Sequence, residues 1–239
     1  MALQNFEEAI KAASSKAVEL IQDGQTIGLG SGRAVAQALF MISEKIKRDR
    51  LKLSFVPSSF QIEFLTRRLG LQLVCLEADK PPDLALDGAD QVEIGSLDMI
   101  KGGGGALARE KIIDSYSKRV SIIVDESKLT QRLGEGETVP VEALPFGVEA
   151  VMERIRRLGG EATLRQAQGK VGPIITDNGN MIVDANFGPI GDPAGLEREI
   201  KMIPGVVEVG IFVNVADTVY VGGRGGSVEV LRRKRGAKG

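Results

Sequence analysis

The sequence predicts an α/β fold built on a parallel sheet, with a smaller α+β domain inserted toward the C-terminal end. In the first half of the chain, short apolar runs alternate with helical stretches, which is the pattern of consecutive βαβ units. From residue 135 the order changes to strand, helix, strand, strand, helix, strand, which favours a ferredoxin-like unit. We therefore expect a Rossmann-like domain formed by 1–134 and 213–239, and a small α+β domain formed by 135–212.

The elements of the larger domain are predicted from apolar spacing and turn residues. A first helix is expected over about 4–23, because apolar residues recur there at helical spacing and Gly24 is placed to end it. Further helices are expected at 33–48, at 59–69 and directly after the glycines at 102–105, and strands at 26–29, 53–56, 71–76, 84–86 and 119–124. Ligands bind beyond the carboxyl ends of parallel strands, and the glycine- and aspartate-rich segments follow such strands.

The small domain is predicted from six consecutive elements. They are a strand at 139–144, a helix at 147–158, strands at 161–166 and 180–186, a helix at 194–202 and a strand at 206–212. Beyond them, 218–221 and 227–231 are strand-like, and we expect them to return to the first sheet. The basic tail at 232–239 is expected to be a solvated end in preference to a nucleic-acid-binding arm.

Composition limits the classes of function. The 239 residues have a net charge of −1, 43% hydrophobic residues and 4% aromatic residues, without a basic stripe, so no nucleic-acid partner is expected. No apolar run reaches the ~20 residues that a membrane span needs. The first stretch carries Glu7 and Glu8 and lacks a signal-peptide pattern, so we expect a cytoplasmic protein.

The absence of histidine narrows the possible chemistry. Histidine triads, imidazole bases and H-E-x-x-H zinc sites are excluded, so acid–base work falls to carboxylates, lysines or tyrosines. Cys75 is the single cysteine and lies in the apolar run 73–76, where we expect a buried strand residue and not a nucleophile. A disulfide within the chain is impossible, and we expect no metal site because C-x-x-C spacing is absent as well.

The stretch Lys101–Lys111, which reads K-G-G-G-G-A-L-A-R-E-K, is the expected centre of the protein. Four consecutive glycines contribute nothing to packing and suit a backbone that approaches an anion or a substrate closely. The helix formers that follow place Glu110 within about two turns of the helix start, with backbone N–H groups directed at the loop. Lys101, the loop amides and nearby carboxylates together suit proton transfer on a polar substrate.

Asp87 and Asp90 lie upstream, in D-G-A-D, directly after a predicted strand. Taken alone, both fit turn chemistry, in which aspartate is common, and Glu110 alone fits a solvated helix face. Beside Lys101 and the glycine run, and without a histidine to act as base, we interpret all three carboxylates as catalytic.

The glycine turn Gly28–Gly32 follows the first predicted strand and admits three interpretations. A dinucleotide fingerprint would need glycine where Arg33 stands. A tight turn without a ligand remains open. A phosphate cradle fits better, because Gly30 and Gly32 permit close approach, Ser31 supplies a hydroxyl and Arg33 supplies a charged fork.

These segments, in this order, resemble ribose-5-phosphate isomerase of the A type. The resemblance extends over most of the chain and rests on Gly28–Gly32, Asp87–Asp90, Lys101–Lys111, Asp177–Asn180 and Ile203–Val207. It implies interconversion of ribose 5-phosphate and ribulose 5-phosphate through an enediol, in the non-oxidative pentose phosphate pathway, without a metal or an organic cofactor. The expected partner is thus a phosphosugar, and we expect a homodimer or homotetramer.

The resemblance also implies residue roles. Glu110 matches the base that moves a proton between C2 and C1, and Asp87 matches the residue tied to opening of the sugar ring. Asp90 and Lys101 match groups that hold the hydroxyls and the developing oxyanion, and Lys128 matches a lysine on the phosphate side. Such a reaction needs a desolvated base and a cation or donors for the enediolate oxygen, which agrees with these assignments.

The chain departs from the family pattern at two places. The family's glycine loop usually continues with Ser-Thr, where this chain has Arg33 and Ala34, so two hydroxyls are lost and a guanidinium is gained. The family's D-G-A-D-E has its glutamate replaced by Gln91. The first departure bears on phosphate recognition and substrate preference, whereas we expect the second to be peripheral.

Two other classes of protein use a similar sheet. Amino-sugar-phosphate deaminases and phosphogluconolactonases rely on histidine, which this sequence lacks. A sugar-phosphate-sensing domain of a transcription regulator would bring a helix-turn-helix, for which the first 24 residues are too short, and would have no need for Glu110 and Lys101. Turnover of ribose 5-phosphate would separate the three.

Overall fold

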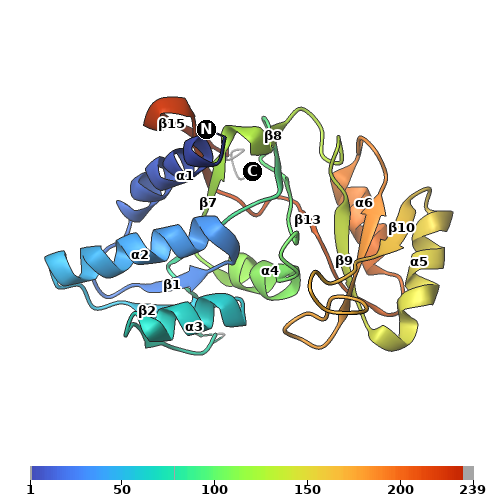
Figure 1. Ribbon diagram of the computed structural model, residues 1–239, viewed down its shortest axis with the longest axis horizontal. Coiled ribbons are helices and arrows are strands. Elements are labelled where there is room, and N and C mark those ends of the chain that lie inside the picture. The colour runs from blue at the N-terminus through green and yellow to red at the C-terminus, as the bar shows by residue number, and fades with distance from the viewer. Residues whose placement is uncertain (1, 78, 234–239) are drawn as a thin grey trace.

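A seven-stranded sheet forms the centre of the larger part of the molecule (Figure 1). The computed structural model describes residues 2–77 and 79–233, so most of the predicted basic tail lies outside it. The strand order is β15-β14-β7-β4-β1-β2-β3, and neighbours are parallel except for β14 and β15. The strands are β1 (Thr26–Leu29), β2 (Ser54–Pro57), β3 (Gln72–Leu73), β4 (Leu84–Asp87), β7 (Val120–Asp125), β14 (Thr218–Gly222) and β15 (Val228–Arg232). The predicted return of the last two segments to the first sheet is confirmed.

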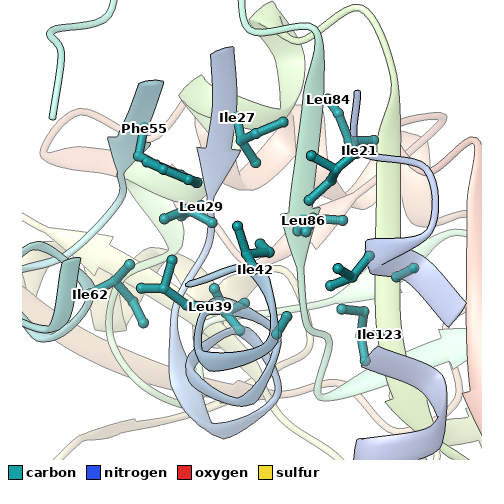
Figure 2. Packing of buried hydrophobic residues seen from close by; sticks show 14 of the residues in the cluster. Ile21, Ile27, Leu29, Leu39, Ile42, Phe55, Ile62, Leu84, Leu86 and Ile123 are labelled. Carbon is teal, nitrogen blue, oxygen red and sulfur yellow. The ribbon is translucent and has the colours of Figure 1, made fainter. Parts of the chain in front are cut away.

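Helices cover both faces of this sheet, as expected for successive βαβ units. The apolar cluster on one face joins strand residues to α1 (Ala2–Val18), α2 (Gly32–Asp49) and α3 (Phe60–Arg68). The cluster on the other face includes Ile113 of α4 (Leu107–Tyr116). Adjacent residues of β4 divide between the faces, because Leu84 and Leu86 belong to the first cluster and Ala85 to the second. Figure 2 shows side chains of β1, β2 and β4 packed against α2 and α3.

A four-stranded antiparallel sheet forms the small α+β unit, at the right of Figure 1. Its elements are β9 (Val139–Ala143), α5 (Val148–Arg157), β10 (Glu161–Leu164), β11 (Met181–Asn186), α6 (Pro193–Lys201) and β12 (Val206–Val209). The spatial order β10-β11-β9-β12 and the antiparallel pairing agree with the predicted ferredoxin-like arrangement. The two helices pack with the sheet around a core of their own.

A third sheet connects the two parts and was not predicted from the sequence. Its order is β13-β6-β5-β8, with strands β5 (Gln91–Glu93), β6 (Met99–Ile100), β8 (Leu129–Thr130) and β13 (Ile211–Phe212). Strands of two or three residues carry no readable alternation, which explains the omission. Because β13 leaves the small unit and pairs with β6, the two parts share backbone hydrogen bonds there. The domain boundaries at 134/135 and 212/213 stay a prediction.

The structure corrects the prediction for the segment 71–76. Only Gln72 and Leu73 form a strand, β3, at the edge of the large sheet, and Cys75 is exposed. The prediction of a buried strand cysteine is therefore wrong. Leu73 is the last paired residue of β3, opposite Phe55, so Cys75 lies beyond the strand and outside the sheet. Among the described helices, none is both long and apolar enough to cross a membrane.

The core that α2 forms with the large sheet can be tested at two neighbouring positions. Leu39 is fully buried, whereas Phe40, the next residue on α2, is 48% exposed. Leu39→Ala should lower the free energy of unfolding by about 2–5 kcal/mol, because it removes buried methyl groups and leaves a cavity. Phe40→Ala, the matched control, should change it by less than about 0.5 kcal/mol. Urea denaturation measures both, and equal effects would contradict this packing.

Candidate active site

A cavity of about 180 Å³ lies at the carboxyl-terminal edge of the large sheet. Its wall is formed by segments that follow β1, β4 and β7, together with the glycine loop and the first turn of α4. This is the position expected for a ligand site of a parallel sheet. The cavity brings together the predicted site residues other than Gly30, namely Ser31, Gly32, Arg33, Asp87, Asp90, Lys101, Glu110 and Lys128.

The ammonium of Lys101 is the centre of the cluster. Its Nζ lies 2.9 Å from Asp87 Oδ2 and 3.0 Å from Glu110 Oε2, and it donates to the carbonyl of Gly88 at 2.7 Å. Lys101, Asp87 and Glu110 are each at most 5% exposed. Nζ also lies 5.3 Å from the ring centroid of Phe212, which is fully buried. A buried charge requires such a complete set of partners.

The cluster perturbs the acidity of its own members. Burial disfavours the ammonium of Lys101, but the carboxylates of Asp87 and Glu110 outweigh burial and raise its pKa above the usual value. Burial, followed by the negative charge of Asp87, raises the pKa of Glu110 to about 7, against the opposing effect of Lys101. Glu110 is therefore poised near neutral pH, which is the range in which a carboxylate acts well as a general base.

Asp114 is a member of this cluster that the sequence reasoning missed. It is 2% exposed, and neither of its carboxyl oxygens has a hydrogen-bond partner among the described residues. Burial, followed by the negative charge of Asp87, raises its pKa well above the usual range. The available signal was its spacing, because Asp114 lies four residues after Glu110 and hence on the same face of α4.

Gly30 creates the space for Asp87. An ideal Cβ at Gly30 would lie 1.8 Å from Asp87 Oδ1, which no side chain can accommodate. The backbone N–H of Gly30 donates to Leu86 O at 2.9 Å, which holds the two strands together at this point. Gly30 thus lies behind the carboxylate and does not line the cavity.

The glycine loop between β6 and α4 presents its backbone to the cavity. The N–H of Gly103 donates to Asp90 Oδ2 at 2.7 Å, and a Cβ at Gly103 would lie 2.7 Å from Asp90 Oδ1. Gly102 has φ +111°, a value that L side chains rarely adopt. The first turn of α4 follows and contains Glu110. The loop therefore needs glycine for its conformation and for its close approach to Asp90.

The opposite side of the cavity is formed by the start of α2 and the turn after β7. Ser31 precedes α2 but makes no side-chain capping bond, because its hydroxyl is bonded to the hydroxyls of Ser58 and Ser59 at 2.8 and 2.7 Å. The N-terminus of α2 carries the positive end of the helix dipole. With Lys128 on the same wall, this side is suited to an anion such as a phosphate.

The described residues contain no group of three or more cysteine, aspartate or glutamate side chains placed to hold a metal ion. The cavity instead combines a buried base, a buried cation and backbone donors at one end with helix N–H groups and Lys128 at the other. This arrangement can bind a phosphorylated polyol and move a proton next to its carbonyl group.

Known proteins share this sequence and fold. Residues 54–226 match the model of the family described as ribose 5-phosphate isomerase A (phosphoriboisomerase A). The ribose-5-phosphate isomerase A of Archaeoglobus fulgidus is 47% identical over 213 residues, covering 88% of this chain and 93% of that protein. The ribose-5-phosphate isomerase A of Methanocaldococcus jannaschii is 42% identical over 231 residues, covering 97% of this chain and 100% of that protein.

Solved structures agree over nearly the whole chain. The ribose 5-phosphate isomerase A of Methanocaldococcus jannaschii superimposes with a TM-score of 0.89 at 41% identity, covering 95% of this chain and 99% of that one. A D-ribose-5-phosphate isomerase in complex with phospho-erythronic acid superimposes with a TM-score of 0.92 at 39% identity, covering 96% of this chain and 100% of that one. By the family model, the identity of these relatives and the shared fold, the chain belongs to the ribose 5-phosphate isomerase A family.

Proposed function

We propose that this protein interconverts ribose 5-phosphate and ribulose 5-phosphate by proton transfer between C2 and C1. The observation that carries the proposal is the buried contact of Glu110 with Lys101 at 3.0 Å, inside a cavity walled by the glycine loop. Membership of the family and the likeness to a relative bound to phospho-erythronic acid support the same substrate.

In the first half of the reaction, the Glu110 carboxylate takes the proton from C2 of the open-chain aldehyde. The C–H electron pair forms the C1–C2 double bond, and the carbonyl pair moves to O1, which becomes an oxyanion. The ammonium of Lys101 and the loop amides stabilise that charge, and such preorganised donors act most strongly in a buried site. Asp87, held against Lys101 at 2.9 Å, is assigned to opening of the sugar ring.

In the second half, the proton of the O2 hydroxyl passes to O1, which leaves the negative charge on O2. Glu110 then returns its proton to C1, and the O2 electron pair forms the ketone at C2, so atoms and charges balance. Asp90 is assigned to the sugar hydroxyls. Ser31, Gly32, Arg33 and Lys128 are assigned to the phosphate, with the guanidinium of Arg33 where the family usually has a hydroxyl.

Three further properties stay predictions. We expect action in the non-oxidative pentose phosphate pathway, a cytoplasmic location and a homodimer or homotetramer. Light scattering of the purified protein would measure the oligomeric state.

Glu110→Gln should keep the fold and reduce kcat for ribose 5-phosphate on the order of 10³-fold or more, because an amide cannot accept the proton. Glu149→Gln provides a matched control, since Glu149 is also an acid in the first turn of a helix but is exposed. A coupled assay of ribulose 5-phosphate formation measures both variants. Activity of Glu110→Gln within tenfold of the parent would remove Glu110 from the role of base.

The rate should depend on pH through Glu110. Because the base must be ionised and its pKa is raised to about 7, kcat/KM should fall about tenfold per pH unit below pH 7. The phosphate of the free substrate has a second pKa of about 6 and can also affect kcat/KM. Measuring kcat as well separates the two, because kcat reports ionisation in the enzyme–substrate complex. An acid limb at the ordinary glutamate value of 4.5 would contradict the assignment.

Gly30→Ala should strongly lower kcat although residue 30 does not line the cavity. The added Cβ would lie 1.8 Å from Asp87 Oδ1, so the carboxylate must move away from Lys101. We expect a loss of kcat on the order of 10²-fold, which is typical of a displacement of about 1 Å in a catalytic group. Gly191→Ala is a useful comparison, because a Cβ at Gly191 meets no atom within 4 Å and its φ is not positive. Unchanged kcat in Gly30→Ala would contradict the role of this contact.

A further inference from the structure

Arg165 holds the glycine loop from the side of the small α+β unit. It directly follows β10, and its Nη1 donates to Gly102 O at 2.8 Å and to Gly103 O at 2.9 Å. On the other edge of the guanidinium group, Nε donates to Asp184 Oδ2 at 2.8 Å, and Nη2 pairs with Asp184 Oδ1. The Arg165 and Asp184 side chains are 17% and 19% exposed, so the guanidinium is well shielded from water.

The two carbonyls that Arg165 binds determine where the next two N–H groups point. In a trans peptide the C=O and the N–H point in opposite directions, and the described residues contain no cis peptide. Fixing Gly102 O thereby directs the N–H of Gly103, which donates to Asp90 Oδ2. Fixing Gly103 O directs the N–H of Gly104, which donates to no acceptor among the described residues. Gly104 lines the cavity, whereas Arg165 does not.

A run of four glycines needs such an external constraint. Glycine has the greatest backbone freedom of all residues, so a free glycine loop would populate many directions for each N–H. Inside the loop, Gly105 N donates to Gly102 O at 2.9 Å, which leaves the peptide between Gly103 and Gly104 fixed by Arg165. The guanidinium charge of Arg165, bonded to Gly103 O, also polarises that peptide and strengthens the Gly104 N–H as a donor.

We propose that Arg165 is a positioning residue for the isomerisation, which fixes the glycine loop so that the Gly104 N–H meets the enediolate oxygen alongside Lys101. The proposal rests on the proposed function. Arg165 itself touches neither the cavity nor the reacting atoms. Its effect should therefore appear in the transition state, where the oxygen carries charge, more than in binding of the neutral carbonyl.

Other ties between the small unit and α4 do not reach the loop. Arg109 donates to Asn178 Oδ1 and Asp177 O, and Lys111 donates to Val209 O and Ile211 O. These contacts hold the helix that carries Glu110, whereas Arg165 alone among these cations binds loop carbonyls.

The test compares Arg165→Gln and Arg165→Lys with Arg233→Gln. Arg233 is a matched control because it also pairs with an aspartate, Asp98, and donates to the carbonyls of Ala216 and Leu97, at 18% exposure and outside the cavity. The purified full-length variants are assayed for kcat and KM with ribose 5-phosphate and for inhibition by phospho-erythronic acid, whose carboxylate carries the charge of the enediolate. The melting temperature of each variant is recorded.

We expect Arg165→Gln to lower kcat by about 10- to 100-fold, with KM within about threefold, and to weaken inhibition by phospho-erythronic acid by a factor similar to the loss in kcat. Arg165→Lys keeps the positive charge but loses the planar set of donors, so its kcat should lie between those of Arg165→Gln and the parent protein. Arg233→Gln should keep kcat and inhibition within about twofold of the parent, whatever its melting temperature.

Three results would overturn the proposal: an unchanged kcat in Arg165→Gln, a rise in KM alone, or equal losses of kcat in Arg165→Gln and Arg233→Gln at equal melting temperature. Failure of the proposed function is distinguishable, because the parent protein would then not turn over ribose 5-phosphate at all.

Discussion

The candidate active site depends on one buried ammonium shared by two buried carboxylates. Lys101 pairs with Asp87 and Glu110 at 2.9 and 3.0 Å, where water cannot screen the charges. Asp114 adds a third buried carboxyl to the same group, so one cation faces three acids. Burial, followed by the negative charge of Asp87, keeps the pKa of Glu110 near 7 despite its contact with Lys101. The cluster therefore holds a buried carboxylate whose pKa lies near neutral pH, as the proposed role of Glu110 requires.

Two features of the fold hold this buried cluster in place: glycines beside the carboxylates, and contacts from the small α+β unit. Gly30 and Gly103 remove the side chains that would collide with Asp87 and Asp90, so both carboxylates can approach the backbone. The small α+β unit lies beside the loop and α4, and its polar groups bind the carbonyls and cations of the segment 102–111. A separate layer for support leaves the edge of the parallel sheet free to bind substrate.

Much of this arrangement was predictable, and the remainder has physical reasons for escaping prediction. Apolar periodicity predicted the alternation of strands and helices and the ferredoxin-like order. The glycine and aspartate segments at strand ends predicted the edge of the sheet where the cavity lies. Asp114 was missed despite lying four residues after Glu110, because a charged residue on a helix is ordinarily solvated. Arg165 was missed because its partners Gly102, Gly103 and Asp184 are distant in sequence. Cys75 was placed wrongly because local apolar composition does not reveal where a sheet ends, and β5, β6, β8 and β13 are too short to show a pattern.

A ¹³C NMR titration of the Glu110 side-chain carboxyl, in the parent protein and in Lys101→Met, tests directly whether the buried ammonium sets the pKa of Glu110. The signal is assigned by its absence from Glu110→Gln. We expect a pKa of about 7 in the parent protein and a clearly higher pKa in Lys101→Met, because burial and Asp87 then act without the opposing ammonium. A pKa near the ordinary value of 4.5 in the parent protein, or an unchanged value on removal of Lys101, would contradict it.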